Sequence, residues 1–243
     1  MKWYLLNARS RLRFALSEPR YALRAAFREL TLADERFLAS ATGAPVLRIR
    51  QYLQEPAATP EFVDHLRKCE GEFLKGTSSA DLWAKKILLQ YAAVRAIRPQ
   101  TVVETGVASG ISSSYLLLAL HRNRKGTLHS VEIGDSYHLP LDKEPGWIVP
   151  GWLRSRWQLH IGDASVILPG LMQELSPVDI FIHDSLHSYE HMKLEFGIAR
   201  PHVRTGGLIL ADDALWNTAF REFADATHSA AAEIVRGVGF MRT

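Results

Sequence analysis

The sequence contains a single cysteine, Cys69, among its 243 residues. One cysteine can form neither an intramolecular disulfide nor a cysteine metal cluster, so a reducing compartment such as the cytoplasm is expected. The sequence also lacks an uninterrupted apolar run of 18 residues, which excludes a membrane-spanning helix. The apolar stretch near the start is too short for a signal peptide. These absences predict a cytoplasmic protein.

A strong charge of one sign is missing too, because the net charge is only +3. No nucleic-acid-binding motif is present, so no nucleic-acid partner is expected. The basic residues nevertheless gather in residues 1–30, where they alternate with apolar ones. This pattern fits a helix lying on an anionic membrane, or a helix packing on the main domain or on a partner subunit in a homo-oligomer. We favour the second interpretation.

The order of the segments predicts the fold class. Residues 1–75 are expected to be a helical extension broken by prolines, whose role the sequence does not indicate. From residue 76 to residue 243, strands and helices alternate with short connections. This alternation predicts an α/β domain with a doubly wound, Rossmann-like, mostly parallel sheet covered by helices on both faces. The expected strands are 101–103, 127–133, 157–161, 178–182 and 208–211, with two short strands, 232–235 and 239–242, at the end.

A glycine turn follows the first of these strands. Glu104 ends the strand, Gly106 and Gly110 lie in the turn, and a helix is predicted over 112–121. The Gly-x-x-x-Gly spacing differs from the dinucleotide fingerprint Gly-x-Gly-x-x-Gly, and Glu104 would repel a pyrophosphate. A nicotinamide-dependent oxidoreductase is therefore disfavoured, and a cationic or hydroxyl-rich ligand fits better.

Acidic residues also follow the other strands, at the sheet edge where ligands bind in such folds. S-adenosylmethionine (SAM) would give each of them a role. Glu104 and the turn would face its amino-acid moiety, and Glu132 would bind the ribose hydroxyls. Asp163 and the backbone N–H of Ala164 would contact the adenine, although Asp163 is equally placed to cap the next helix.

These motifs resemble those of class I SAM-dependent methyltransferases. The resemblance is carried by Glu104-Thr-Gly-Val-Ala-Ser-Gly110, Glu132 and Ile161-Gly-Asp163-Ala. The segments 181–190 and 206–213 are similar to the bacterial small-molecule O-methyltransferase branch, the methyltransferase-24-like proteins. The resemblance implies an enzyme that methylates a hydroxyl of a small-molecule acceptor such as a sugar, a glycoside or a secondary metabolite. A non-catalytic SAM-binding or partner module that uses the basic N-terminal helices is the alternative.

The resemblance also implies a divalent cation. In metal-dependent relatives, an aspartate after the fourth strand and an Asp-Asp or Asp-Asn pair after the fifth hold Mg²⁺. The corresponding residues here would be Asp184, Asp212 and Asp213. Ser185 and Leu186 depart from the Asp-Gly-Asp-His motif of many relatives, so a structural role for the aspartates stays open. His187 is the expected general base, with Asp184 beside it in the catalytic site.

Three further features carry weaker expectations. His183 should be packed, and His191 should be solvated on the following helix. Trp216 and Asn217 could hold a substrate or start a helix. The connection 134–156, with two tryptophans, could be a lid over the site or a packing insertion.

Overall fold

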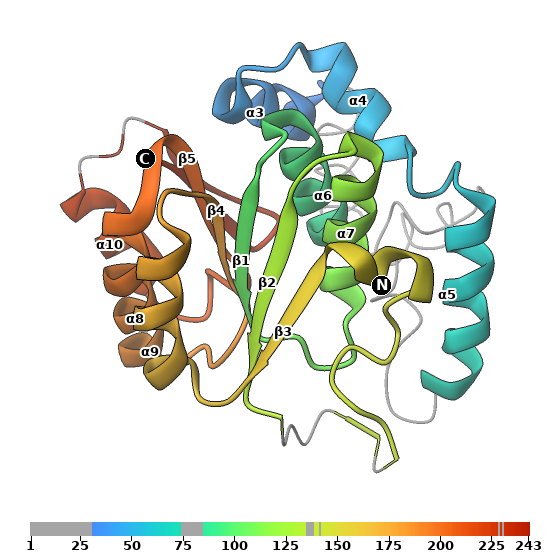
Figure 1. Ribbon diagram of the computed structural model, residues 1–243. Helices are drawn as coiled ribbons and strands as arrows, with labels where there is room; N and C mark the ends of the chain where they lie inside the picture. Colours follow the sequence, from blue (N-terminus) through green and yellow to red (C-terminus); the bar gives the residue numbers. More distant parts are fainter. Residues whose placement is uncertain (1–30, 74–84, 135–138, 141, 228, 230) are drawn as a thin grey trace, which may run out of the picture.

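Seven strands form one sheet in the order β3-β2-β1-β4-β5-β7-β6 (Figure 1). The computed structural model describes residues 31–73, 85–134, 139–140, 142–227, 229 and 231–243. Strands β1 to β5 are parallel, whereas β7 is antiparallel to both β5 and β6. The predicted doubly wound, mostly parallel sheet is therefore confirmed. The strands are β1 Thr101–Thr105, β2 Thr127–Glu132, β3 Trp157–Ile161, β4 Val178–His183, β5 Val203–Ala211, β6 Ala232–Val235 and β7 Val238–Arg242.

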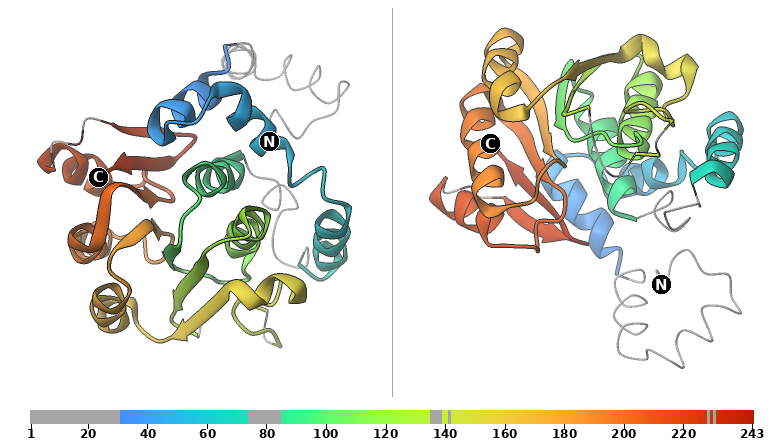
Figure 2. Two further views of the ribbon diagram at one scale, coloured as in Figure 1. Left: turned by 45° about the horizontal axis from the view of Figure 1, so that its top comes forward. Right: turned by 90° about the horizontal axis from the view of Figure 1, so that it is seen from below.

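Helices cover both faces of the sheet (Figures 1 and 2). On one face lie α6 (Lys85–Ile97) and α7 (Ile111–Asn123), and on the other lie α8 (Ala164–Leu175), α9 (Tyr189–Ala199) and α10 (Ala219–Ala226). Successive side chains of a strand point to opposite faces. Val102 of β1 accordingly packs in the hydrophobic cluster of α6 and α7, and Val103 packs in that of α8 and α9. The two clusters explain why the strands are apolar on both sides.

The N-terminal helices α3 (Ala33–Thr42), α4 (Val46–Gln54) and α5 (Pro60–Phe73) pack on the α6 and α7 side. Leu38, Ile49 and Phe62 are fully buried there, and the ring of Phe62 meets that of Tyr115 edge-on at 5.0 Å. This part of the extension thus shares the domain's hydrophobic core. The basic segment 1–30 lies outside the described residues. None of the described helices is long and apolar enough to cross a bilayer.

The connection from β2 to β3 contributes to the core. Ile148, Val149 and Leu153 are almost completely buried, and Nε2 of His65 lies 2.7 Å from the carbonyl oxygen of Ile148. A 3₁₀ helix, Gly151–Arg156, then leads into β3. In its described part the connection therefore packs into the core, and its expected role as a lid over the site stays a prediction.

Strand β5 is longer than predicted. The Gly206-Gly207 pair was expected to precede the strand, but β5 begins at Val203 and runs through both glycines. The pairing with β4 shifts register between Val178 and Ile180, and Gly206 has a φ of +75°. The glycines therefore mark a bulge inside the strand. The predicted start at residue 208 was wrong for this reason.

Candidate active site

The predicted site residues gather at the carboxyl edge of the sheet, which faces the viewer in the right-hand view of Figure 2. Glu132 ends β2, and its Oε2 accepts hydrogen bonds from the backbone N–H groups of Val107 and Ala108, both at 2.7 Å. The turn after β1 thus presents two N–H groups to a carboxylate, as such turns do to anions. Glu132 is 6% exposed, so it lies at the floor of this edge and holds the turn to β2.

The glycines fix the position of the turn. Gly106 has a φ of +83°, and a Cβ atom there would lie 2.0 Å from the carbonyl oxygen of Asp184. Gly110 has a φ of +86°, and its Cβ would lie 2.7 Å from the Cα of Gly146. Only glycine allows both the backbone conformation and these close approaches. The turn is therefore clamped between the end of β4 and the β2–β3 connection.

Glu104 is completely buried beneath this turn. Its Oε1 accepts hydrogen bonds from the hydroxyls of Ser113 (2.5 Å) and Ser130 (2.6 Å), and Trp157 Nε1 donates to Ser130 Oγ at 2.7 Å. Its Oε2 has no hydrogen-bond partner among the described residues. Burial raises the pKa of Glu104 to about 7, and the two serines only partly offset this. A buried carboxyl group with a strongly raised pKa is a candidate for binding a cationic group.

Asp163 has the capping role. Its Oδ1 accepts from the backbone N–H and from the hydroxyl of Ser165, both at 2.7 Å, at the start of α8. These hydrogen bonds lower the pKa of Asp163. Adenine contacts by Asp163 and Ala164 stay a prediction. Ile133 and Ile161 lie at the ends of the two strands before it and are 61% and 56% exposed, an apolar pair that the sequence patterns did not single out.

The second acidic group surrounds a lysine and a histidine. Lys86 of α6 places Nζ 2.5 Å from Asp212 Oδ2 and 3.5 Å from Asp213 Oδ1. His187 Nε2 lies 3.8 Å from Asp213 Oδ2 and 3.9 Å from Asp184 Oδ1. The structure thus brings Asp184, Asp212, Asp213 and His187 together, as predicted, and adds Lys86, which the sequence patterns missed.

The cluster perturbs its members' ionisation. Desolvation and the nearby charge of Asp212 raise the pKa of Asp184 well above its ordinary value. Burial alone would lower the pKa of Lys86, but the charge and hydrogen bond of Asp212 outweigh it and raise that pKa. Burial and the neighbouring His183 lower the pKa of His187 below its ordinary 6.5. His187 is therefore neutral at neutral pH, the form in which an imidazole accepts a proton.

A buried glutamate supports this cluster from below. Glu195 of α9 is fully buried and accepts from His183 Nδ1 (2.6 Å) and Thr105 Oγ1 (2.6 Å). It also binds Ser185 Oγ (2.7 Å) and His191 Nε2 (2.9 Å). The packed state of His183 is confirmed, but the expectation of a solvated His191 was wrong because Glu195 holds its ring. Ser185, where many relatives carry glycine, joins this network.

Apolar side chains border His187 on the solvent side. Trp216 is 70% exposed, and its ring meets that of His187 edge-on at 5.3 Å. Leu186 and Leu215 are 63% and 59% exposed. Asn217 takes the structural role, since its Oδ1 accepts from Ala219 N at 2.8 Å and its Nδ2 donates to His187 O at 3.0 Å.

A sequence model of one protein family, described as "Methyltransferase domain", matches residues 103–214, from within β1 to just after β5. Residues 103–214 are therefore similar in sequence to a methyltransferase domain. The match contains the glycine turn, Glu132, Asp163 and the acidic group around His187. Lys86 lies outside it, on the helix before β1. No curated protein sequence matches the chain.

Solved structures of several methyltransferases share the fold of this chain. The SAH-bound methyltransferase PaMTH1 of Podospora anserina is 14% identical, with a TM-score of 0.52 over 74% of this chain and 87% of that one. The O-methyltransferase TomG of Streptomyces achromogenes, in complex with SAM, is 19% identical, with a TM-score of 0.50 over 66% and 80%. MycE, in complex with Mg and SAH, is 17% identical, with a TM-score of 0.50 over 74% and 53%. The chain therefore spans about half the length of MycE.

The two implied ligands fit this site differently. SAM fits it, because the buried Glu104 Oε2 has no partner among the described residues, the clamped turn lies above it, and Ile133 and Ile161 are exposed at the ends of the neighbouring strands. A divalent cation does not fit as well, because an ammonium already contacts Asp212 Oδ2. Within the described ranges, no three His, Cys, Asp or Glu side chains have the geometry of a metal site. Mg²⁺ at Asp184, Asp212 and Asp213 stays a prediction from the resemblance.

Proposed function

We propose that the domain transfers the methyl group of SAM to a hydroxyl of a small-molecule acceptor, such as a sugar, a glycoside or another secondary metabolite. The contact between Gly106 and the backbone of Asp184 carries this proposal. It supports the assignment of the glycine turn and the His187 cluster to one site. A donor methyl and an acceptor hydroxyl held at this edge would thus lie within reach of each other.

On the donor side, the chain's own groups would bind and orient the cofactor. The buried carboxylate of Glu104 suits the ammonium of an amino-acid group, and the free lone pairs of Glu132 suit ribose hydroxyls. Ile133 and Ile161 offer apolar surface to a purine ring. Bound SAM supplies a sulfonium whose methyl group is open to nucleophilic attack.

On the acceptor side, neutral His187 would take the proton of the attacking hydroxyl. The oxygen–methyl bond forms as the sulfur–methyl bond breaks, so the products are a methyl ether, SAH and a protonated imidazole. Asp213, with Oδ2 3.8 Å from His187 Nε2, would stabilise that imidazolium. The exposed rings and methyl groups of Trp216, Leu186 and Leu215 favour an acceptor with an apolar or aromatic face.

Two of the fold relatives take part in the synthesis of secondary metabolites, which agrees with this acceptor class. TomG is involved in tomaymycin synthesis, and MycE belongs to the mycinamycin biosynthetic pathway. A cytoplasmic location and a homo-oligomeric state are further parts of the proposal, with the single, buried cysteine as support for the first.

Calorimetry with SAM and the full chain tests the proposed binding of the methyl donor. We expect saturable binding that Glu132→Ala weakens about a hundredfold, because two hydrogen bonds to a charged group are lost. Glu190→Ala, at an exposed site on α9, is the matched control and should bind as the wild type does. An intact protein that binds NADH but no SAM would overturn the proposal.

Mass spectrometry with SAM and a panel of hydroxylated acceptors tests the catalytic half. His187→Asn should lose turnover while its affinity for SAM stays unchanged, which separates proton removal from donor binding. Wild-type protein that binds SAM yet methylates no acceptor in the panel would favour the non-catalytic module instead.

A further inference from the structure

Lys86 occupies the centre of the carboxylate group that the resemblance assigns to a metal ion. Its Nζ lies between Asp212 Oδ2 (2.5 Å) and Asp213 Oδ1 (3.5 Å), and its side chain is 29% exposed. The Asp212 side chain is only 6% exposed, so its charge needs a nearby cation. The ammonium of Lys86, which lies between the two carboxylates, supplies this counter-charge.

A divalent cation would need the same oxygens. Mg²⁺ is bound at about 2.0–2.1 Å in an octahedron of oxygen ligands. An ion at that distance from Asp212 Oδ2 would also lie beside the like-charged Nζ of Lys86, and the two cations would repel each other strongly. The carboxylates can therefore hold the lysine or a metal ion in this position, but not both.

We propose that Lys86 is the resident cation of the acceptor site and takes the place of a divalent metal ion, so that methyl transfer here requires no metal. The proposal rests on the function proposed above. Lys86 acts as a positioning residue, since its ammonium fixes Asp212 and Asp213, and Asp213 faces His187 Nε2 at 3.8 Å. The hydroxyl proton then leaves to the imidazole without a metal ion to polarise the acceptor.

Its location explains why the motifs alone predict a metal. Lys86 lies on α6, before β1 and 126 positions from Asp212, and outside the segment that the family model matches. The aspartates by themselves resemble a Mg²⁺ site, and the cation that fills it comes from another part of the chain.

Binding of Mn²⁺ alone to the full-length protein, followed by electron paramagnetic resonance, tests the proposal without any turnover. Wild type and Lys86→Arg should bind no Mn²⁺ at this site at millimolar concentrations. Lys86→Ala should gain Mn²⁺ affinity by about tenfold or more, because Asp212 and Asp213 lose their counter-charge. The double variant Lys86→Ala/Asp212→Asn should lose that gain. Lys86→Met keeps the length of the side chain and replaces Lys86→Ala if the latter does not fold.

Lys85→Met, which changes the neighbouring lysine on the same helix, is the matched control and should bind no Mn²⁺. Wild-type binding of Mn²⁺ that Asp212→Asn abolishes, with no gain in Lys86→Ala, would overturn the proposal.

Turnover gives an independent readout. Wild type should keep its activity in excess chelator. Lys86→Met should lose at least about tenfold in kcat, with little change in KM for SAM. Lys86→Arg should retain most of the wild-type kcat. Activity that chelator abolishes and Mg²⁺ restores would refute the role of Lys86. A protein that binds no SAM would instead refute the proposed function, and the Mn²⁺ result would still decide the occupant of the carboxylate cluster.

Discussion

At the scale of single residues, the ligand-binding role proposed for Glu104 opposes its contribution to stability. A carboxylate that is fully buried with one unpartnered oxygen destabilises the free protein once it ionises. The two serines donate to Oε1 and leave Oε2 without a partner among the described residues. A glutamine would keep the shape and remove the charge.

Glu104→Gln is therefore expected to make the free protein more stable and to weaken SAM binding. The folded-state pKa of Glu104 is raised from 4.5 to about 7, so its cost to stability is absent below pH 4.5, grows between pH 4.5 and 7, and is constant above. At pH 8 the variant should gain on the order of 1–3 kcal/mol in the free energy of unfolding by urea. At pH 4.5 the two proteins should be nearly equal. A variant that is less stable at pH 8 would show that Glu104 is a structural acid.

At the scale of elements, Glu195 joins the end of β1, the end of β4 and α9. Its four partners are Thr105, His183, Ser185 and His191. Burial alone would raise the pKa of Glu195, but these partners, His183 foremost, outweigh it and lower the pKa to about 2. The network therefore stabilises the β4–α9 connection on which His187 lies.

Glu195→Gln should destabilise the protein, in the opposite direction to Glu104→Gln. Because the folded-state pKa is depressed, the stabilisation is complete above pH 4.5 and is lost as the pH falls towards 2. At pH 7 the variant should lose about 2–3 kcal/mol in the free energy of unfolding, and its stability should change less than that of the wild type between pH 4.5 and 2. Equal pH profiles for the two proteins would contradict this assignment. Glu190→Gln, exposed on the same helix, is the control.

At the scale of the whole molecule, the sequence was most informative where a pattern is local. The strand runs, the glycine turn and the acids at the strand ends predicted the sheet and the edge that carries the site. Contacts between distant segments were not predictable in this way. Lys86 reaches Asp212 across 126 positions, Glu195 gathers partners from three elements, and the β2–β3 connection enters the core. Local periodicity carries no information about such pairings.

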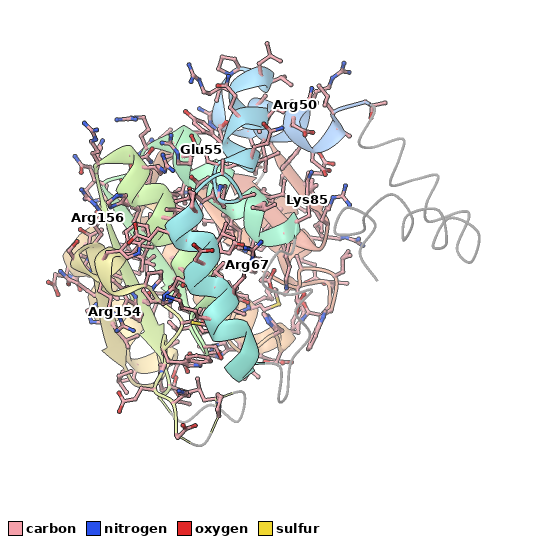
Figure 3. All side chains as sticks on the ribbon, turned by 90° about the vertical axis from the view of Figure 1, so that its right-hand side faces the viewer. Arg50, Glu55, Arg67, Lys85, Arg154 and Arg156 are labelled. Atoms are coloured by element: carbon pink, nitrogen blue, oxygen red, sulfur yellow. The ribbon has the colours of Figure 1, made fainter. Side chains whose placement is uncertain are left out.

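The attachment of the N-terminal helices is another long-range feature. Glu55, which is labelled in Figure 3, follows the end of α4. It accepts from Tyr91 Oη (2.6 Å) and from Arg95 Nε (2.6 Å) and Nη2 (3.0 Å) of α6. The Arg95 guanidinium also lies 4.5 Å from the ring centre of Tyr52. Tyr91 is fully buried, so loss of Glu55 leaves its hydroxyl without this acceptor.

Glu55→Ala should therefore weaken the packing of α3–α5 on the domain. The free energy of unfolding should fall by about 2 kcal/mol. This loss is smaller than for a fully buried ion pair, because the Glu55 side chain is 24% exposed. Hydrogen exchange of residues 33–54 should rise more than that of β1 and β4. Asp64→Asn breaks the exposed 3.8 Å pair with Arg67 on α5 and is the control, with an expected loss below about 0.5 kcal/mol. If both variants behave alike, the Glu55 pair does not anchor the extension, and apolar burial of Leu38, Ile49 and Phe62 alone holds these helices to the domain.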